Sequence, residues 1–129
     1  MSYLLDTHVF IWFINGQASL PKEVRNKIKN LKNSCYISIA SIWEIAIKIK
    51  LKKLNIAASF SQIQHFMTVN QIEVLPITFE HIEVLHQLEL HHRDPFDRII
   101  IAQCMSEELT IFTKDQNFNS YPIKIKWQN

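Results

Sequence analysis

Acidic side chains are the residues of this sequence best placed to do chemistry. The 129 residues include only four aspartates, Asp6, Asp94, Asp97 and Asp115. Carboxylates that gather at one site repel one another, so a cation must neutralise them or one must hold a proton. A set of oxygen ligands without Cys or His suits a hard ion, Mg²⁺ or Mn²⁺. Such an ion can activate water and support in-line attack on a phosphodiester.

Each aspartate also has a structural explanation. Asp94 stands before Pro95, which is typical of a helix N-cap, and Asp97 falls where a capping-box acid interacts with the helix dipole. Asp115 lies in a polar stretch, residues 113–117, that is typical of a turn. Asp6 is the hardest to explain in this way, because it ends an apolar run. A carboxylate there is costly to desolvate unless it is paired or bound to a metal.

Glu44 is the fifth candidate, and two interpretations of it stay open. It lies within an otherwise apolar stretch, residues 42–47, and Lys48 follows four residues later. An exposed Glu44–Lys48 pair on a helix would contribute a few tenths of a kcal/mol to stability. Alternatively, the carboxylate points inward and joins the acidic site.

The elements that must position these acids alternate along the chain. Strands are predicted at residues 3–5, 35–37, 72–75, 110–112 and 123–127. Helices are predicted at about residues 9–14, 21–32, 38–53 (capped by Ser38 or Ser41), 59–69, 79–90 and 94–108. The alternation predicts one α/β domain over residues 1–129, a parallel-sheet α/β/α sandwich. Ligands bind at the carboxyl ends of such strands, where all four aspartates would then lie.

Composition excludes several classes of site. Gly16 is the only glycine, so no glycine-rich loop can hold phosphates. Cys35 and Cys104 lack metal-binding spacing and are expected to be reduced and buried. No apolar run reaches the roughly 18 residues of a membrane span, and no secretory signal is evident. The sequence therefore predicts a cytoplasmic protein that does not enter the membrane.

Basic residues are concentrated in one segment. Residues 22–53 contain nine Lys and Arg against two Glu, a net charge of +7, while the rest of the chain sums to −5. A basic region beside an acidic one is typical of a polyanion-binding protein with its own acidic pocket. Two solvated helix faces would give the same pattern.

Four blocks of residues together resemble a known family, the PIN domain, and within it the VapC-type toxins of bacterial toxin–antitoxin pairs. The blocks are Leu4-Leu5-Asp6-Thr7-His8, Ser41 to Lys48, His92 to Arg98 with Ile101-Ala102-Gln103, and Thr113-x-Asp115-x-x-Phe118. The resemblance implies an RNA-cleaving, metal-dependent endoribonuclease that leaves a 5′-phosphate and a 3′-hydroxyl. It also implies a homodimer and a cognate antitoxin that blocks the site, for which exposed Ile56 and Phe60 are candidate docking residues.

The resemblance also assigns roles to residues. It implies that Asp6, Glu44, Asp97 and Asp115 are catalytic and bind Mg²⁺ or Mn²⁺, with Thr113 and Asp94 supporting them. From the basic segment and its surroundings we expect RNA backbone contacts by Arg98, Lys48, Lys50 and Lys52.

The histidines and tryptophans give weaker indications of function than the acidic residues do. His8 lies near the proposed site and is a candidate for contact with substrate or partner. His91 and His92 lack zinc-binding spacing and are expected at the surface or at a helix end. Trp12, Trp43 and Trp127 are expected in the core rather than as platforms for base stacking.

Three alternatives to a ribonuclease remain. A phosphoacceptor receiver domain also uses strand-end acids, Mg²⁺ and a lysine, but it needs paired acids where Asp6 stands alone. A non-catalytic RNA- or protein-binding module could keep the same scaffold. A DNA or structure-specific nuclease would use the same metal chemistry.

Overall fold

One parallel sheet organises the computed structural model, which describes residues 1–56 and 58–127. Its five strands lie in the order β3-β2-β1-β4-β5. They are β1 (Ser2–Leu5), β2 (Ser34–Ser38), β3 (Ile72–Leu75), β4 (Thr110–Phe112) and β5 (Lys124–Lys126). Every neighbouring pair is parallel. The predicted parallel α/β/α sandwich is therefore confirmed.

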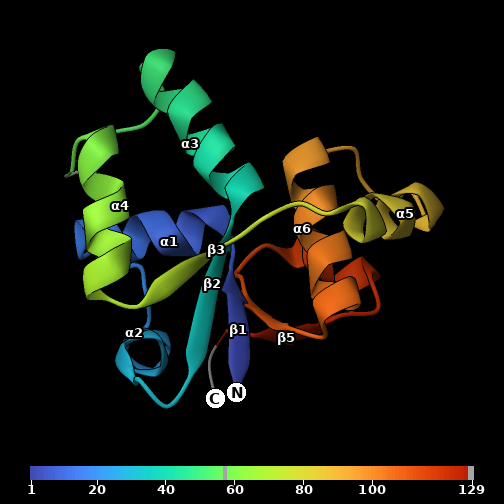
Figure 1. Ribbon diagram of the computed structural model, residues 1–129, viewed down its shortest axis with the longest axis horizontal. Coiled ribbons are helices and arrows are strands. Elements are labelled where there is room, and N and C mark those ends of the chain that lie inside the picture. Colours follow the sequence, from blue (N-terminus) through green and yellow to red (C-terminus); the bar gives the residue numbers. More distant parts are fainter. Residues whose placement is uncertain (57, 128–129) are drawn as a thin grey trace.

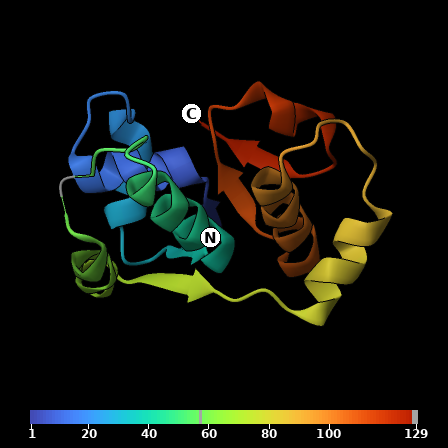
Figure 2. The same cartoon turned by 90° about the horizontal axis from the view of Figure 1, so that it is seen from above.

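Helices cover the sheet on both sides (Figures 1 and 2). One group comprises α1 (Thr7–Asn15), α2 (Lys22–Lys29), α3 (Ile39–Lys50) and α4 (Phe60–Val69). The other comprises α5 (Phe79–Gln87) and α6 (Pro95–Glu107), followed by a short 3₁₀ helix, η1 (Gln116–Ser120), which the sequence did not predict. Parallel strands require such crossovers, because no tight turn can join them.

Burial on both faces of the central strand explains why its sequence is continuously apolar. Tyr3 and Leu5 point into one core with Phe10, whereas Leu4 points into the other with Ile100. Leu4 and Leu5 are fully buried. Side chains alternate between the faces of a strand, so β1 contributes to both cores at once. The residue that follows β1 is thereby held on the most rigid part of the sheet.

The predicted helix over residues 79–90 ends early, at Gln87. Leu88 adopts an extended conformation, and the carbonyls of Leu88 and Glu89 accept hydrogen bonds from the Arg98 guanidinium, at 3.1 and 2.8 Å. Because a side chain satisfies these carbonyls, the chain can leave the helix without losing hydrogen bonds. The helix over residues 38–53 also ends early, at Lys50, and Ser38 rather than Ser41 caps it, accepting from Ala40 N at 3.1 Å.

Both cysteines are buried and unpaired, as predicted. Burial raises the pKa of the Cys35 thiol to about 11, and it raises the pKa of Cys104 further. The single glycine, Gly16, ends α1 in the left-handed conformation with φ of +62°, which a residue without Cβ adopts at little cost. Among the helices of the described chain, none has the length and apolarity needed to cross a bilayer.

Candidate metal centre

Acidic side chains gather at the carboxyl edge of the sheet, the edge seen from above in Figure 2. Asp6 directly follows β1, and Thr113 follows the neighbouring strand β4. Glu44 comes from α3, which leaves the end of β2, and Asp97 comes from the first turn of α6. The fold thus brings together segments from the whole length of the chain.

Asp6 is buried, with 3% of its surface exposed, and both of its carboxylate oxygens are held in place. Oδ1 accepts from the backbone N of Thr7 at 2.8 Å, which makes Asp6 the N-cap of α1. Oδ2 accepts from Thr113 Oγ1 at 2.7 Å and lies 3.1 Å from Nδ1 of His8. The Nε2 atom of His8 in turn accepts from the backbone N of Lys114 at 3.3 Å. The pairing of β1 with β4 therefore fixes the carboxylate.

Glu44 pairs with Lys48, as the first interpretation predicts, but its carboxylate is buried rather than exposed. Its Oε2 atom pairs with Lys48 Nζ at 2.9 Å, and its Oε1 atom accepts from the buried Thr7 hydroxyl at 2.9 Å. The same hydroxyl lies 2.8 Å from Ser41 Oγ, so that one threonine links α1 to two residues of α3. Since Glu44 is only 9% exposed, its charge faces the site rather than solvent.

Asp97 has the most perturbed carboxyl group. Its Oδ2 atom lies 3.2 Å from His92 Nε2, and its side chain is 15% exposed. Burial, as the largest cause, and then the negative charges of Asp6, Asp94, Asp115 and Glu44, in decreasing order, together raise the pKa of Asp97 to about 8. Four other acids are therefore within electrostatic reach of the Asp97 carboxyl group.

Asp94 and Asp115 also serve local structure. Asp94 Oδ1 accepts from the backbone N atoms of Phe96 and Asp97, at 2.9 and 3.2 Å, and so caps α6. Asp115 Oδ1 accepts from Asn117 N at 2.9 Å and begins η1, while its own N donates to Thr113 Oγ1 at 3.0 Å. The capping and turn explanations are therefore correct for these two residues, and each still adds negative charge to the site.

The donor set fits a hard divalent cation. It offers several carboxylates and a threonine hydroxyl, and the raised pKa of Asp97 reflects burial first and then the negative charge of four neighbouring acids. Over residues 1–56 and 58–127, no three acidic, His or Cys groups already stand close enough to ligate one ion. Asp6, Glu44, Asp97 and Asp115 are the residues that would hold a cation, and they would have to draw together around it.

Three residues at the site were not identified from the sequence. His92 lies at a helix end, one of the two expected places, two residues before the Asp94 cap of α6. Its side chain is 15% exposed, and it contacts Asp97 and the Tyr121 hydroxyl, the latter at 2.7 Å from Nδ1. Its position just before the Asp94 cap could have indicated that it folds back over the helix start. Thr7 was visible only as a neighbour of Asp6. No local pattern marks Tyr121.

The basic residues do not form a single surface. Figure 1 shows α2 near the amino edge of the sheet, whereas α3 extends upward past the carboxyl edge, so the lysines at its end lie on the side of the acids. Lys48, Lys50 and Lys52 are exposed there. Arg98 is engaged within the protein, with Leu88 O, Glu89 O and the Tyr121 hydroxyl, the last at 3.2 Å. The RNA contacts of these four residues remain predictions.

The expectation of a core position is wrong for Trp43, which is 62% exposed and meets the Phe96 ring edge-on at 5.2 Å between centroids. Glu44 and Ile45 occupy the inward face of α3, and the helical repeat turns Trp43 away from them. Trp12 and Trp127 do pack against the main core, as predicted.

Comparisons with known proteins agree with this geometry. The PIN domain matches residues 3–124, and no curated protein sequence matches the chain. Among solved structures, VapBC2 from Rickettsia felis, bound to a DNA fragment from their promoter, is 17% identical with a TM-score of 0.72, over 98% of both chains.

Two further structures are similar. DNA-bound VapBC from Salmonella typhimurium is 18% identical with a TM-score of 0.73, over 98% of this chain and 97% of that one. VapBC-5 from Mycobacterium tuberculosis, of the VapBC family of toxin–antitoxin systems, is 19% identical with a TM-score of 0.58, over 97% and 95%. These structures share the fold, and the family match covers nearly the whole sequence: the chain belongs to the PIN domain family.

Proposed function

We propose that the protein is a Mg²⁺-dependent endoribonuclease and the toxin component of a type II toxin–antitoxin system. Asp6, Glu44, Asp97 and Asp115 would hold Mg²⁺ or Mn²⁺, with Thr113 and Asp94 in support. When bound, the ion would activate water and neutralise phosphate charge at the scissile bond. RNA hydrolysis by water would leave a 5′-phosphate and a 3′-hydroxyl.

The uncompensated acidic charge is the observation that carries the proposal. Burial is the largest cause of the rise in the pKa of Asp97 to about 8, and the negative charges of four further acids, Asp6, Asp94, Asp115 and Glu44, add to it. Structural ion pairs usually neutralise such charge, but here Lys48 is paired with Glu44 alone. A site that binds a divalent cation and a phosphodiester needs this excess of negative charge, which a purely structural cluster does not.

The neighbouring residues would orient the acids. Thr113 and His8 hold Asp6, the Thr7 hydroxyl holds Glu44, and His92 holds Asp97. Each of these contacts leaves the carboxylate at the sheet edge while restricting its rotation. Restricted side chains lose less entropy when they bind an ion, although the acids would still have to move closer together to share it.

The proposal includes two protein partners, an antitoxin and a second copy of the chain. The name of VapBC-5, a member of a family of toxin–antitoxin systems, supports the first. An apolar groove of about 260 Å³ beside Ile39, Phe60 and Val74 offers a docking place. Phe60 is exposed there, whereas Ile56 packs against the core. Light scattering during gel filtration should give twice the 15.3 kDa chain mass if the homodimer forms.

The test compares wild type with Asp6→Asn on total RNA and on matched single-stranded DNA, with Mg²⁺ and with EDTA. Asn keeps the shape of Asp6 but removes its charge. Glu73→Gln is the matched control, because Glu73 is an exposed acid on β3 outside the site. We expect RNA cleavage only by wild type and by the control, only with Mg²⁺, and with 5′-phosphate ends.

Other outcomes would contradict the proposal. RNA binding without cleavage, unaffected by EDTA, would identify a non-catalytic binding module. Equal or faster cleavage of DNA would identify a different nuclease. Ends with 2′,3′-cyclic phosphate would indicate attack by the 2′-hydroxyl without a metal, and would refute the acidic mechanism.

A further inference from the structure

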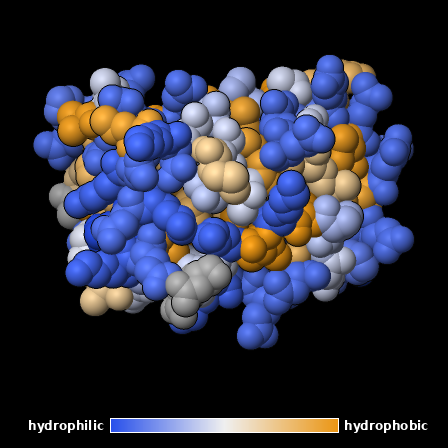
Figure 3. Space-filling model, turned by 90° about the horizontal axis from the view of Figure 1, so that it is seen from below, coloured by the Kyte–Doolittle hydropathy of each residue, from blue (hydrophilic) through white to orange (hydrophobic). Residues whose placement is uncertain are grey.

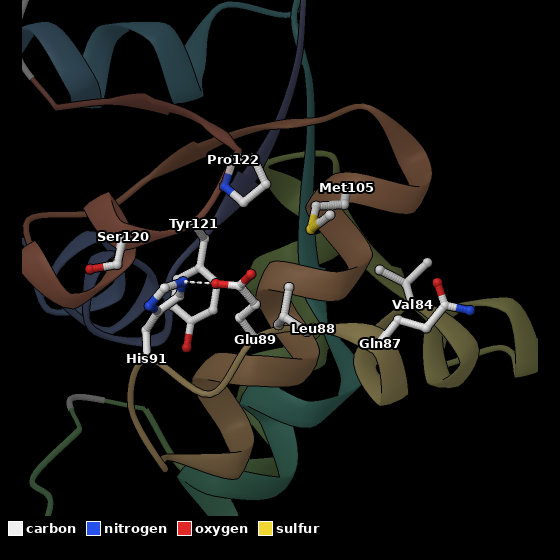
Figure 4. Close-up of a pocket in the computed structure, with 9 residues that line it drawn as sticks. All are labelled: Val84, Gln87, Leu88, Glu89, His91, Met105, Ser120, Tyr121 and Pro122. Carbon is white, nitrogen blue, oxygen red and sulfur yellow. Dashed lines mark ion pairs between the residues drawn. The ribbon is translucent and has the colours of Figure 1, made fainter.

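A second cavity lies beside the acidic site, on the outer side of α6. It has a volume of about 650 Å³ and opens between the end of α5, the segment that follows it, and the chain just after η1 (Figure 4). Residues of three separate segments line it, and no contact of the acidic site needs the cavity to exist. Its volume lies within the range of pockets that hold small organic ligands, and it is larger than one base needs.

Only one histidine ring separates this cavity from Asp97. Tyr121, which lines the cavity, bonds through its hydroxyl to Nδ1 of His92, and Nε2 of the same ring meets Asp97. Arg98, the residue after Asp97, bonds to the same Tyr121 hydroxyl. A nucleotide could therefore place its base in the cavity while a neighbouring phosphate lies at the acidic site.

The walls of the cavity are apolar and the rim is polar. Leu88, Met105 and Pro122 surround the space in Figure 4, with the Tyr121 ring at its side. Glu89 and His91 cross the opening, with Glu89 Oε2 lying 3.4 Å from His91 Nε2. Apolar walls with a polar rim suit a planar ring that has unreactive faces and a hydrogen-bonding edge.

The rim presents a defined pattern of donors and acceptors. The Glu89 carboxylate accepts through two oxygens, and His91 Nε2 lies 3.4 Å from it, where a protonated nitrogen would donate. The backbone N of His91 donates to Glu89 O at 3.1 Å, forming a tight turn that keeps the two side chains adjacent. Arg98 fixes the same turn by its bond to Glu89 O. The turn thus holds the two residues side by side at the rim, where the Glu89 side chain is 85% exposed.

We propose that this cavity binds a guanine base of the RNA, at a nucleotide next to the scissile phosphate, with Glu89 and His91 reading its Watson–Crick edge. The inference rests on the proposed ribonuclease function and specifies its substrate. Unstacked bases of single-stranded RNA are recognised in this way, by rings held between side chains and by bonds to their edges.

Guanine is the base whose edge complements this rim. Its O6 accepts from His91, and its N1–H and N2–H donate to the two oxygens of Glu89. Adenine and cytosine place an acceptor where guanine has N1–H, which would face a carboxylate oxygen. Uracil offers one N–H, but its O2 would oppose the second oxygen of Glu89. A bidentate contact discriminates between bases by about tenfold or more.

The test uses short oligouridylates that differ only in their central nucleotide, titrated into isotope-labelled wild-type protein in EDTA so that no strand is cut. Amide chemical shifts report both the affinity and the place of binding. We expect the strand with central guanine to bind about tenfold more tightly than the other three. The largest shifts should be at Glu89, His91 and Tyr121.

The diagnostic variant is Glu89→Gln, in which an amide donor replaces one of the two acceptors. We expect it to reduce the guanine preference to less than about threefold. Glu83→Gln, an exposed acid on α5 that does not line the cavity, is the matched control and should keep the preference. Glu89 is exposed, so the variant should fold normally, and its amide spectrum will show this.

Each outcome bears on the proposal. Equal affinity for the four strands, a guanine preference that survives Glu89→Gln, or shifts that bypass the cavity would overturn it; in the last case a partner protein becomes the better occupant. Cleavage-site sequencing separates this inference from the proposed function. RNA cleaved without a guanine nearby refutes the inference alone, whereas selective guanine binding without cleavage refutes the nuclease and keeps the binding site.

Discussion

Removing the charge of Asp97 should stabilise the metal-free protein while abolishing its response to Mg²⁺. The pKa of Asp97 rises from 3.8 to about 8 in the folded chain, chiefly through burial and then through four neighbouring acids. A carboxyl group whose pKa rises on folding adds stability at low pH, and this stability is lost as the pH increases through the folded-state value. Asp97→Asn carries no such charge and should escape that loss.

The magnitude follows from the displacement of the pKa. At about 1.4 kcal/mol per pKa unit, the full displacement would correspond to between about 5 and 6 kcal/mol. Solvent reaches 15% of the side chain, and screening reduces the penalty to about 3 kcal/mol. Asn at the third position of α6 also forgoes about 0.3–1 kcal/mol of favourable interaction with the helix dipole. The net gain should be about 2 kcal/mol above pH 8.

Thermal unfolding in EDTA, from pH 5 to pH 9, measures this gain. A net stabilisation of about 2 kcal/mol should raise Tm by about 8 °C at pH 9, and the difference should shrink toward pH 5. With Mg²⁺, wild type should gain stability at high pH and Asp97→Asn should not. Glu73→Gln, which removes an exposed acid from β3, should behave as wild type throughout.

The reasoning would be refuted if Asp97→Asn were no more stable than wild type at pH 9 in EDTA. That result would mean that the neighbouring acids do not act on Asp97. A gain that persisted unchanged down to pH 5 would also refute it, because folded wild type holds the proton there and most of the loss accumulates between pH 5 and pH 8.

Three further changes test other parts of the structure. Thr7→Val removes the hydroxyl that links α1 to α3, and should lower the free energy of unfolding by about 1–3 kcal/mol in urea titrations. Trp43→Ala should cost less than about 1 kcal/mol in the same assay, because the ring is 62% exposed; a cost of about 3 kcal/mol or more would indicate a hidden core role. Charge reversal at Lys50, Lys52 and Lys53 should weaken RNA binding and flatten its salt dependence, and an unchanged slope in filter binding would exclude that surface.

Local patterns were sufficient to predict most of the fold. The strands at residues 72–75 and 110–112 have the predicted bounds. Thr78 caps α5 and Asp94 caps α6, also as predicted. Errors occurred where a distant side chain decides the outcome. The sequence around Leu88 does not indicate that Arg98 will donate a hydrogen bond to the Leu88 carbonyl where α5 ends.

In the site, too, local sequence patterns predict some residues, whereas contacts between distant segments determine the others. Asp6 and Glu44 could be identified because a carboxylate within an apolar run needs an explanation, and both are buried. His92 and Tyr121 could not, because their meeting depends on a turn after η1 that only the assembled sheet determines. The exposure of Trp43 follows from which face of α3 meets the core, and composition alone does not specify that face.

The strand order has a consequence for when the acidic site can assemble during synthesis. Asp6 is held by Thr113, 107 positions away, and β4 must pair with β1 before that hydrogen bond can form. Synthesis proceeds from the N-terminus, so the nascent chain carries its first acid long before the residue that orients it. The high contact order of this pairing makes assembly of the site a late folding event. A chain still being translated therefore lacks the assembled acidic site, which forms only when the residues of β4 have joined the sheet.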